Sequence, residues 1–263
     1  MSIPSVTTSG QTLTRLNPAT TLHLERIIKK FKIKKILEIG SYVGMGSTQI
    51  FLKNCEQVTC IEDFSANRKF EIEENGLNKT YTMSELFNLV TKNSKKLKLI
   101  EMSSLKAHNF IKNGEFDAVF IDGSHYYPDV LKDIKNYYYK VKKNGLIIGD
   151  DCQGYLSDFS EKLIFENISN DNTIDLKDFK YAQVHPGPIL ACHDLLKSII
   201  FDESKIYNDQ NEDLGYSWIY YYQRTFKNDL NFNIRKFLLN IKLLNKKNFR
   251  RKLIKNGNLG DVI

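Results

Sequence analysis

The segment from Phe116 to Asp151 constrains the fold more than any other stretch of this chain. Two apolar runs, Ala118 to Ile121 and Leu146 to Gly149, are rich in branched and aromatic residues and are bounded by turn residues. This pattern is typical of buried parallel strands, and the residues between the runs predict one helix. The runs end at Asp122 and at Asp150-Asp151, so parallel pairing brings three carboxylates to one sheet edge. Ligands bind at that edge in open α/β sheets.

A Gly-rich turn follows an earlier predicted strand, Ile33 to Gly40, and leads into a helical segment that begins near Ser47. Such a turn lets the backbone approach a ligand closely, with helix N–H groups pointing at it. The spacing of Gly40, Gly44 and Gly46 gives GxxxGxG, which differs from the GxGxxG of dinucleotide sites. A tight strand-to-helix turn without a ligand therefore stays an alternative interpretation.

An acidic residue ends the next predicted strand, Gln57 to Asp63. Glu62 lies 22 residues after Gly40, where a carboxylate accepts hydrogen bonds from ribose hydroxyls. Together, the turn and this acid predict a ligand that contains a nucleoside. Asp63 is the competing candidate for binding the ribose. The alternative interpretation of Asp63 is an acidic residue that faces solvent.

The remaining elements follow from hydrophobic period and turn chemistry. We expect a helix from Ala19, a helix capped by Ser84, a strand over LKLIEM, a short helix from Leu105 to Lys112 and a final strand over SWIYYYQ, with KIYN as its candidate partner. Ser103-Ser104 either meets an adenine edge or simply starts the short helix.

Residues 152–188 are largely irregular and predict a lid or substrate-binding segment. His185 and the prolines after it start a helix through ILACHDLLKSII. We consider His185 as a residue that faces the substrate, and interpret His193 as structural, on the apolar face of that helix. The tyrosines at 126, 127 and 137–139 either contact an acceptor ring or pack on the sheet.

Length and composition fit one α/β enzyme domain with additions. The chain has 263 residues, and we divide it into a lead-in (1–18), a domain (19–223) and a tail (224–263). No run approaches the roughly 18 apolar residues of a membrane span, and the amino terminus lacks signal-peptide features, so we expect a cytoplasmic protein. The four cysteines form no CxxC pair and are expected to be reduced and mostly buried.

Positive charge is concentrated in the tail. Residues 224–255 hold 11 Lys/Arg and one acid, a net charge of +10, whereas residues 1–223 carry −2. This asymmetry argues against nucleic-acid binding by the whole domain. From Asn231 onward, apolar residues recur every three to four positions and predict a basic amphipathic helix. Three contacts are open for this helix: it binds an anionic membrane surface, it binds an acidic partner, or it packs on its own domain.

The pattern resembles the class I S-adenosylmethionine-dependent methyltransferases. The matching pieces are ILEIGSYVGMGST, VTCIED, FDAVFIDGSHYY and GLIIGDD, between about Lys35 and Asp151. The resemblance implies a Rossmann-like, doubly wound, mostly parallel seven-stranded sheet with an antiparallel final strand and helices on both faces. It also implies a set of cofactor-binding residues: Glu38, Gly40, Ser41, Tyr42, Gly44, Ser47, Glu62, Ser103, Ser104 and Asp122.

Within that superfamily, IDGSH followed by a strand ending in two acids is similar to metal-dependent sugar O-methyltransferases of macrolide tailoring and to cephalosporin-hydroxylase-type relatives. The likeness implies that Asp122, Asp150 and Asp151 hold Mg²⁺ and that His125 is the general base. Carboxylates on adjacent strands, ~4.8 Å apart, can share one hard cation. Coordination acidifies a sugar hydroxyl, and imidazole, with an ordinary pKa of about 6.5, takes its proton.

We therefore expect a metal-assisted O-methyltransferase that acts on a sugar, nucleotide-activated or glycan-linked, in surface-polysaccharide or natural-product biosynthesis. Two alternative functions stay open: methylation of another small hydroxyl or phosphoryl-type acceptor, and a non-catalytic RNA-binding protein that uses the basic tail. A homo-oligomeric state also stays open. The non-catalytic interpretations of the site residues are helix capping for Asp150-Asp151 and a solvent-exposed position at a helix start for His125.

Overall fold

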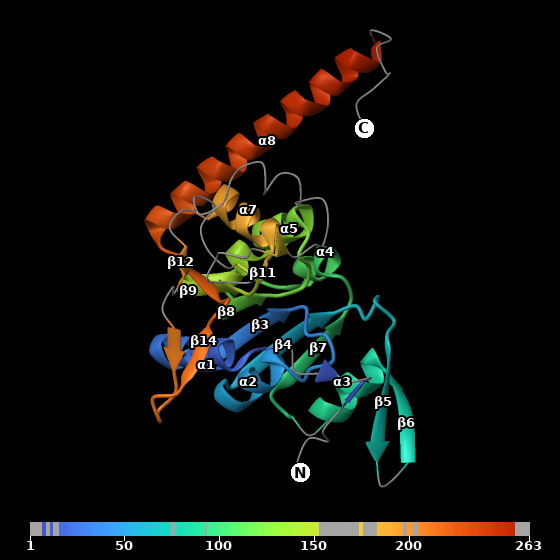
Figure 1. The fold of residues 1–263 in the computed structure, drawn as a ribbon. Helices are drawn as coiled ribbons and strands as arrows, with labels where there is room; N and C mark the ends of the chain where they lie inside the picture. Colours follow the sequence, from blue (N-terminus) through green and yellow to red (C-terminus); the bar gives the residue numbers. More distant parts are fainter. Residues whose placement is uncertain are drawn as a thin grey trace.

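A computed structural model describes residues 7–8, 11–12, 16–74, 77–92, 94–152, 174–175, 183–196, 199–201 and 205–255. A seven-stranded sheet lies at its centre, in the order β12-β15-β9-β8-β3-β4-β7 (Figure 1). These strands span Ile200–Phe201, Tyr220–Gln223, Val141–Gly149, Phe116–Ile121, Lys35–Ile39, Gln57–Glu62 and Leu97–Glu101.

One strand of this sheet opposes the others. β9, β8, β3, β4 and β7 pair in parallel. β15 is antiparallel to β9, and β12 is antiparallel to β15, so β12 runs with the parallel set. The predicted class, a mostly parallel doubly wound sheet with an antiparallel final strand, is confirmed. Parallel register places the ends of β8 and β9 together, because Ile121 pairs with Gly149.

Helices cover both faces of the sheet (Figure 1). α1 (Pro18–Phe31), α2 (Ser47–Asn54) and α3 (Met83–Thr91) lie on one side, and α4 (Ser104–Ala107), α5 (Tyr127–Tyr137) and α7 (Pro186–Leu195) lie on the other. The alternation of side chains along each strand explains both cores. Ile36 and Phe120 face the first layer, whereas Leu37 and Ile121 face the second.

Local sequence fixes several helix ends. Asn17 caps α1, because its side-chain oxygen accepts a hydrogen bond from Thr20 N–H at 2.7 Å. The prediction that Ser84 caps α3 is wrong by two residues. Thr82 is the cap, and its hydroxyl and backbone exchange hydrogen bonds with Glu85 in a capping box. That reciprocal pair satisfies two groups at once, which Ser84 cannot do from inside the helix.

Two hairpins differ from the sequence prediction. β5 (Lys69–Glu74) and β6 (Leu77–Thr82) form an antiparallel pair in a segment that we read only as polar. β13 (Lys205–Tyr207) pairs with β14 (Asp213–Tyr216) and not with the final strand. The expected partnership of KIYN with SWIYYYQ is therefore wrong, because the short connection lets β13 pair with its neighbour in sequence while β12 covers the sheet edge.

The last helix, α8 (Phe226–Lys255), extends away from the domain (Figure 1). Its first turns are anchored where Phe232 is fully buried and stacks on Tyr138, with ring centroids 3.7 Å apart. Arg224 beside it pairs with Asp229, with Nε and Oδ1 2.9 Å apart. The predicted helix is confirmed, and it begins five residues before the expected start at Asn231.

Two 3-10 turns and two short strand pairs complete the description. The turns are His108–Phe110 and Tyr138–Lys140, and the pairs are β1 (Thr7–Thr8) with β2 (Gln11–Thr12) and β10 (Ile174–Asp175) with β11 (Gln183–Val184). All four cysteines are reduced thiols and are buried, as expected. Among the described helices, none is long and apolar enough to cross a membrane. Most of the predicted lid, residues 152–188, lies outside the described residues.

Candidate active site

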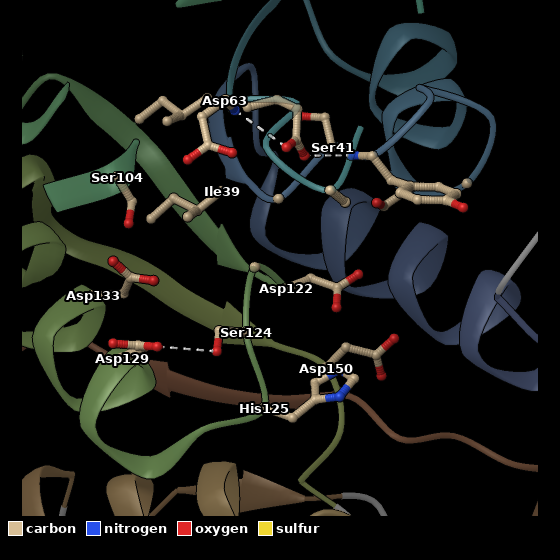
Figure 2. A pocket seen from close by; sticks show the side chains of 18 of the residues that line it. Ile39, Ser41, Asp63, Ser104, Asp122, Ser124, His125, Asp129, Asp133 and Asp150 are labelled. Atoms are coloured by element: carbon tan, nitrogen blue, oxygen red, sulfur yellow. Dashed lines mark hydrogen bonds between the residues drawn. The ribbon is translucent and has the colours of Figure 1, made fainter. Parts of the chain in front are cut away.

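A cavity of about 720 Å³ opens at the carboxyl ends of the central strands. Its walls come from the Gly-rich turn after β3, the ends of β4 and β7, the turn after β8, the residues after β9 and the start of α7. Figure 2 shows that side chains from these separate elements face one space. The volume lies in the range of small-molecule sites, which hold a drug-sized ligand or cofactor.

Close backbone packing shapes the Gly-rich turn. Gly40 has φ +84°, and a Cβ there would overlap the carbonyl oxygen of Asp122 on the neighbouring strand end. Only glycine allows this approach. Tyr42 also has a positive φ, +51°, and its N–H donates to Glu62 at 2.8 Å. Gly40, Ser41, Tyr42 and Ser47, all predicted to bind a cofactor, line the cavity.

Two of the predicted cofactor residues do not line the cavity. Glu38 is fully buried beneath the turn, where it accepts hydrogen bonds from the hydroxyls of Ser47 and Thr48. Burial raises the pKa of Glu38, and these hydroxyl groups oppose the rise. Gly44 faces the ring of Phe87. Both residues therefore support the turn from behind.

Glu62 ends β4 beside the turn. Its carboxylate accepts the backbone N–H groups of Tyr42, Asp63 and Phe64 at 2.8 to 3.1 Å. Burial raises the pKa of Glu62 and these N–H groups lower it. Both Glu62 and Asp63 line the cavity. The hydrogen bonds from the turn fix Glu62 more firmly, so it stays our preferred ribose ligand.

Ser103 and Ser104 line the cavity at the end of β7. Both predicted roles, contact with an adenine edge and the start of a short helix, are compatible with this position. Ser103 occupies the cap position of α4, although its side chain makes no capping hydrogen bond. Facing them is Asp133 from α5, a buried carboxylate that the sequence analysis did not single out. Burial raises the pKa of Asp133 to about 6, and the Ser104 hydroxyl opposes that rise. The carboxylate lies inside a helix, so no strand-end signal marked it.

His125, Asp151 and His185 gather at the other end of the cavity. The Nε2 atom of His125 lies 2.7 Å from Asp151 Oδ2, and Nε2 of His185 lies 3.6 Å from Oδ1 of the same carboxylate. The two imidazole rings are 4.0 Å apart. Among the described residues, these three side chains are the set whose metal-ligand atoms all lie within 4.8 Å of one another.

Backbone packing again explains how the cluster forms. A Cβ at Gly187 would overlap the backbone carbonyl of His125, so only glycine lets the first turn of α7 approach the β8 turn. This contact brings His185 to the cavity, and its contact with the substrate stays a prediction. His193, expected to be structural on the apolar face, is instead exposed, because the turn of α7 directs it to solvent beside Asp194.

The predicted carboxylates Asp122, Asp150 and Asp151 all line the cavity. Burial, together with the neighbouring Asp151 carboxylate, raises the pKa of Asp150 to about 8, and the backbone N–H of Asp151 opposes this rise at 2.9 Å. Asp151 has a positive φ of +61°. Strained backbone of this kind clusters at functional sites. Figure 2 places Asp122 between the Ser104 end and the His125 end of the cavity.

The tyrosines of the segment take structural positions. Tyr137 and Tyr138 are buried in the core, and Tyr137 donates its hydroxyl to the backbone oxygen of Ser104 at 2.7 Å. Tyr127 donates to Asp194 at 2.7 Å. None of the five tyrosines is in the described cavity lining. Packing, the second of our two interpretations, describes Tyr127 and residues 137–139, whereas Tyr126 is exposed.

The chain is similar to a methyltransferase family model and to solved methyltransferase structures. Residues 37–152 match a family model described as a methyltransferase domain. An O-methyltransferase from Bacillus cereus, solved in complex with SAH, is 15% identical with a TM-score of 0.51, and the match covers 82% of this chain and 86% of that one. The O-methyltransferase TomG from Streptomyces achromogenes, involved in tomaymycin synthesis and solved with SAM, is 14% identical with a TM-score of 0.49, covering 79% and 80%.

No protein of curated function matches the sequence significantly. At 15% identity, the likeness to the Bacillus cereus structure shows a shared fold. The resemblance of the Gly-rich turn and the acidic strand ends is confirmed by the family model, which spans both. Residues 37–152 therefore match a methyltransferase-domain family model, and the chain shares the fold of the Bacillus cereus O-methyltransferase.

Proposed function

We propose that this protein is an S-adenosylmethionine-dependent O-methyltransferase that acts on a sugar hydroxyl, on a nucleotide-activated or glycan-linked sugar. One observation carries the proposal. A single cavity joins a nucleoside-type site, the Gly40 turn with Glu62, to a histidine–carboxylate pair, His125 with Asp151. A role in surface-polysaccharide or natural-product biosynthesis follows from the resemblance to sugar-modifying relatives.

The residues around the turn fit S-adenosylmethionine. Gly40 gives the backbone its close approach, Glu62 is held where ribose hydroxyls would donate, and Ser103 lines the wall beyond it. The described lining holds seven carboxylates and one cation, Arg68, which suits a cationic sulfonium. When bound, S-adenosylmethionine supplies an electrophilic methyl group to an aligned nucleophile.

His125 is the group that removes the acceptor proton in this proposal. If Nε2 carries the ring proton, it donates to Asp151 at 2.7 Å, and this hydrogen bond keeps Nδ1 in its basic form. The proton of the acceptor hydroxyl then passes to Nδ1. Asp151 stabilises the resulting imidazolium and keeps the ring oriented, as an orienting carboxylate does in other histidine bases.

We also propose that Asp122, Asp150 and Asp151 hold a divalent cation, Mg²⁺. Their oxygen atoms are the ligand type that Mg²⁺ prefers, and the raised pKa of Asp150 reports a buried carboxylate that a cation would compensate. A bound divalent cation would lower the pKa of an acceptor hydroxyl. Asp151 belongs both to this set and to the cluster with His125 and His185, so the cation and His125 share one carboxylate.

The acidic lining favours acceptors without strong negative charge at the reacting end. A nucleotide sugar would bring phosphates toward these carboxylates, and a bound cation would have to compensate the repulsion. The second candidate function is therefore methylation of another small, uncharged hydroxyl compound. The acidic lining is the observation that favours it.

The test measures methyl transfer from labelled S-adenosylmethionine to a panel of nucleotide sugars, neutral glycosides and phenols. We expect His125→Ala to lower the rate by about 10² to 10⁴-fold. His193→Ala is the matched control, because His193 is an exposed histidine on α7 outside the cavity lining, and its rate should stay within about twofold. Equal rates for His125→Ala and the wild type would remove His125 from the base role.

The metal is tested with the same reaction. EDTA should lower the rate and Mg²⁺ should restore it, whereas Asp122→Asn, Asp150→Asn and Asp151→Asn should each weaken the response to Mg²⁺. Full activity in EDTA would refute the cation while leaving the methyltransferase assignment intact. Transfer to neutral glycosides or phenols alone would favour the second candidate function.

A further inference from the structure

We propose that α8 binds an anionic membrane surface through a row of exposed apolar side chains, and that the basic end of the same helix contacts the lipid headgroups. The row, the α8 stripe, consists of Phe226, Leu230, Ile234, Phe237 and Ile241. This inference goes beyond the proposed methyltransferase function and does not depend on it.

The exposure of these side chains is the first observation. The five residues are between 39% and 82% exposed, and they recur every three or four positions along the helix. Residues with this spacing lie on one face of a helix. Single exposed apolar residues are common on protein surfaces, whereas a contiguous exposed row marks an interaction surface.

The opposite face of α8 already packs on the domain. Phe232 is fully buried, and Leu239 packs against the same core cluster. Ile234 and Ile241 each follow one of these residues by two positions, which is a rotation of about 200° around a helix. The α8 stripe therefore points away from the domain, on a helix that extends away from it (Figure 1).

The charge of α8 identifies the partner as an anionic surface. The helix holds ten Lys/Arg residues and one acid, Asp229, and Asp229 already pairs with Arg224 and Lys143. Seven of the ten cations lie between Lys242 and Lys255, directly after the stripe. On such helices, basic residues are attracted to anionic headgroups, and apolar side chains enter the boundary between headgroups and acyl chains.

Other occupants fit these two features less well. A second copy of the chain would bring together two helices that each carry a net charge of +9, and like charges repel. A nucleic acid would bind the cations through its phosphates and would leave the apolar side chains in water. An anionic lipid surface accommodates both the cations and the stripe.

The test measures binding of the full chain to lipid vesicles by co-sedimentation. One set of vesicles contains phosphatidylcholine alone, and the other contains phosphatidylcholine and phosphatidylglycerol in a ratio of about two to one. We expect binding to the anionic vesicles to be at least ~10-fold tighter, and to weaken as added salt screens the headgroups. Equal binding to both sets, or binding to neither, would overturn the inference.

Phe237→Asn tests the stripe. Loss of a large apolar side chain from the lipid boundary should weaken binding to the anionic vesicles roughly tenfold. Phe110→Asn is the matched control, because Phe110 is 73% exposed on the turn after α4, and its binding should stay within about twofold of the wild type. Unchanged binding of Phe237→Asn would remove the stripe from the contact.

A second variant tests the cations in the full chain. Arg250→Gln, Arg251→Gln and Lys252→Gln together remove three charges, so they should weaken binding to the anionic vesicles roughly tenfold or more. Binding to phosphatidylcholine alone should not change, because its headgroups carry no net charge. The same affinity for anionic vesicles in this variant and in the wild type would contradict the electrostatic contact.

Sedimentation velocity without lipid separates the other occupants. A stable dimer that Phe237→Asn dissociates, in a protein that binds no vesicles, would assign the stripe to a second copy of the chain. A monomer that binds no vesicles would equally overturn the inference and would leave an acidic protein as the occupant.

Discussion

At the scale of single residues, two carboxylates of the candidate site, Asp133 and Asp150, are buried in the protein interior. Asp133 and Asp150 both have raised pKa values, about 6 and about 8, and burial is the largest cause for each. Such groups reduce the stability of the folded state at neutral pH, because ionising them in the interior costs free energy. Their presence in one cavity indicates that binding, and not stability, selected them.

The free-energy cost of ionising the buried Asp133 predicts that the stability of the protein depends on pH. Its pKa rises from 3.8 to about 6 on folding, so folding takes up a proton between these values and stability falls as the pH rises through that window. Asp133→Asn removes the effect. We expect its free energy of unfolding to exceed that of the wild type by ~2 kcal/mol near neutral pH.

Urea denaturation at several pH values measures this difference, which should shrink toward zero below the unfolded pKa. Asp209→Asn serves as the control, because Asp209 is exposed on the connection between β13 and β14 and lies outside the cavity lining. A stability difference for Asp133→Asn that does not change with pH would contradict the assignment of the effect to ionisation.

At the scale of elements, α7 and α8 illustrate how helices far along the chain complete the domain. The first turn of α7 packs against the β8 turn at Gly187 and carries His185 into the cavity. α8 then packs on α7, where Arg235 donates to the backbone oxygen of His193 at 2.5 Å. The anchoring of α8 therefore supports the helix that carries a cavity residue.

Phe232 should provide most of that anchoring. It is fully buried and stacks on Tyr138, with an angle of 4° between the rings. We expect Phe232→Ala to lower the free energy of unfolding by about 3 to 4 kcal/mol, as removal of a buried phenylalanine typically does. Phe237→Ala is the matched control on the same helix, because Phe237 is 64% exposed, and it should change stability by less than ~0.5 kcal/mol.

Chemical denaturation of both variants distinguishes these outcomes. Equal and small losses for the two substitutions would show that α8 is not anchored through Phe232.

At the scale of the whole molecule, the described contacts of α8 lie in its first half. Phe232, Asn233 and Arg235 contact the domain, and Arg224 and Asp229 form an ion pair just before them. The basic residues from Lys242 onward follow these contacts in the chain. The contact that they would make with an anionic membrane surface or an acidic partner stays a prediction, as does the oligomeric state.

Because the described contacts of α8 lie in its first half, we predict that the domain folds without residues 242–263. A chain that ends at Ile241 keeps every anchoring contact named above, so its free energy of unfolding should match that of the full chain within about 0.5 kcal/mol. Cofactor binding should also be unchanged. Thermal unfolding and calorimetry test both points, and a clear loss of stability would show that residues 242–263 pack on the domain.

The sequence predicted the parallel strands and their acidic ends well, because each depends on a short local pattern. Glu62, Asp122, Asp150 and Asp151 follow directly from apolar runs that end in carboxylates, and parallel pairing places such ends on one edge. The cap at Thr82 was not predicted, because Thr82 and Ser84 are both suitable cap residues and local sequence does not choose between them. The β5–β6 hairpin was not predicted either, because a polar pair of strands has only a weak pattern of hydrophobic residues.

By itself, the sequence determined the class of the fold, the Gly-rich turn and the strand ends that carry acids. Only the tertiary structure decided how side chains on separate elements meet. It paired His125 with Asp151, brought His185 to them on α7, and aimed Asp133 of α5 at the Ser104 wall. The physical reason is that these meetings depend on how helices pack across the sheet, and close approaches such as Gly187 against His125 have no signature in local spacing.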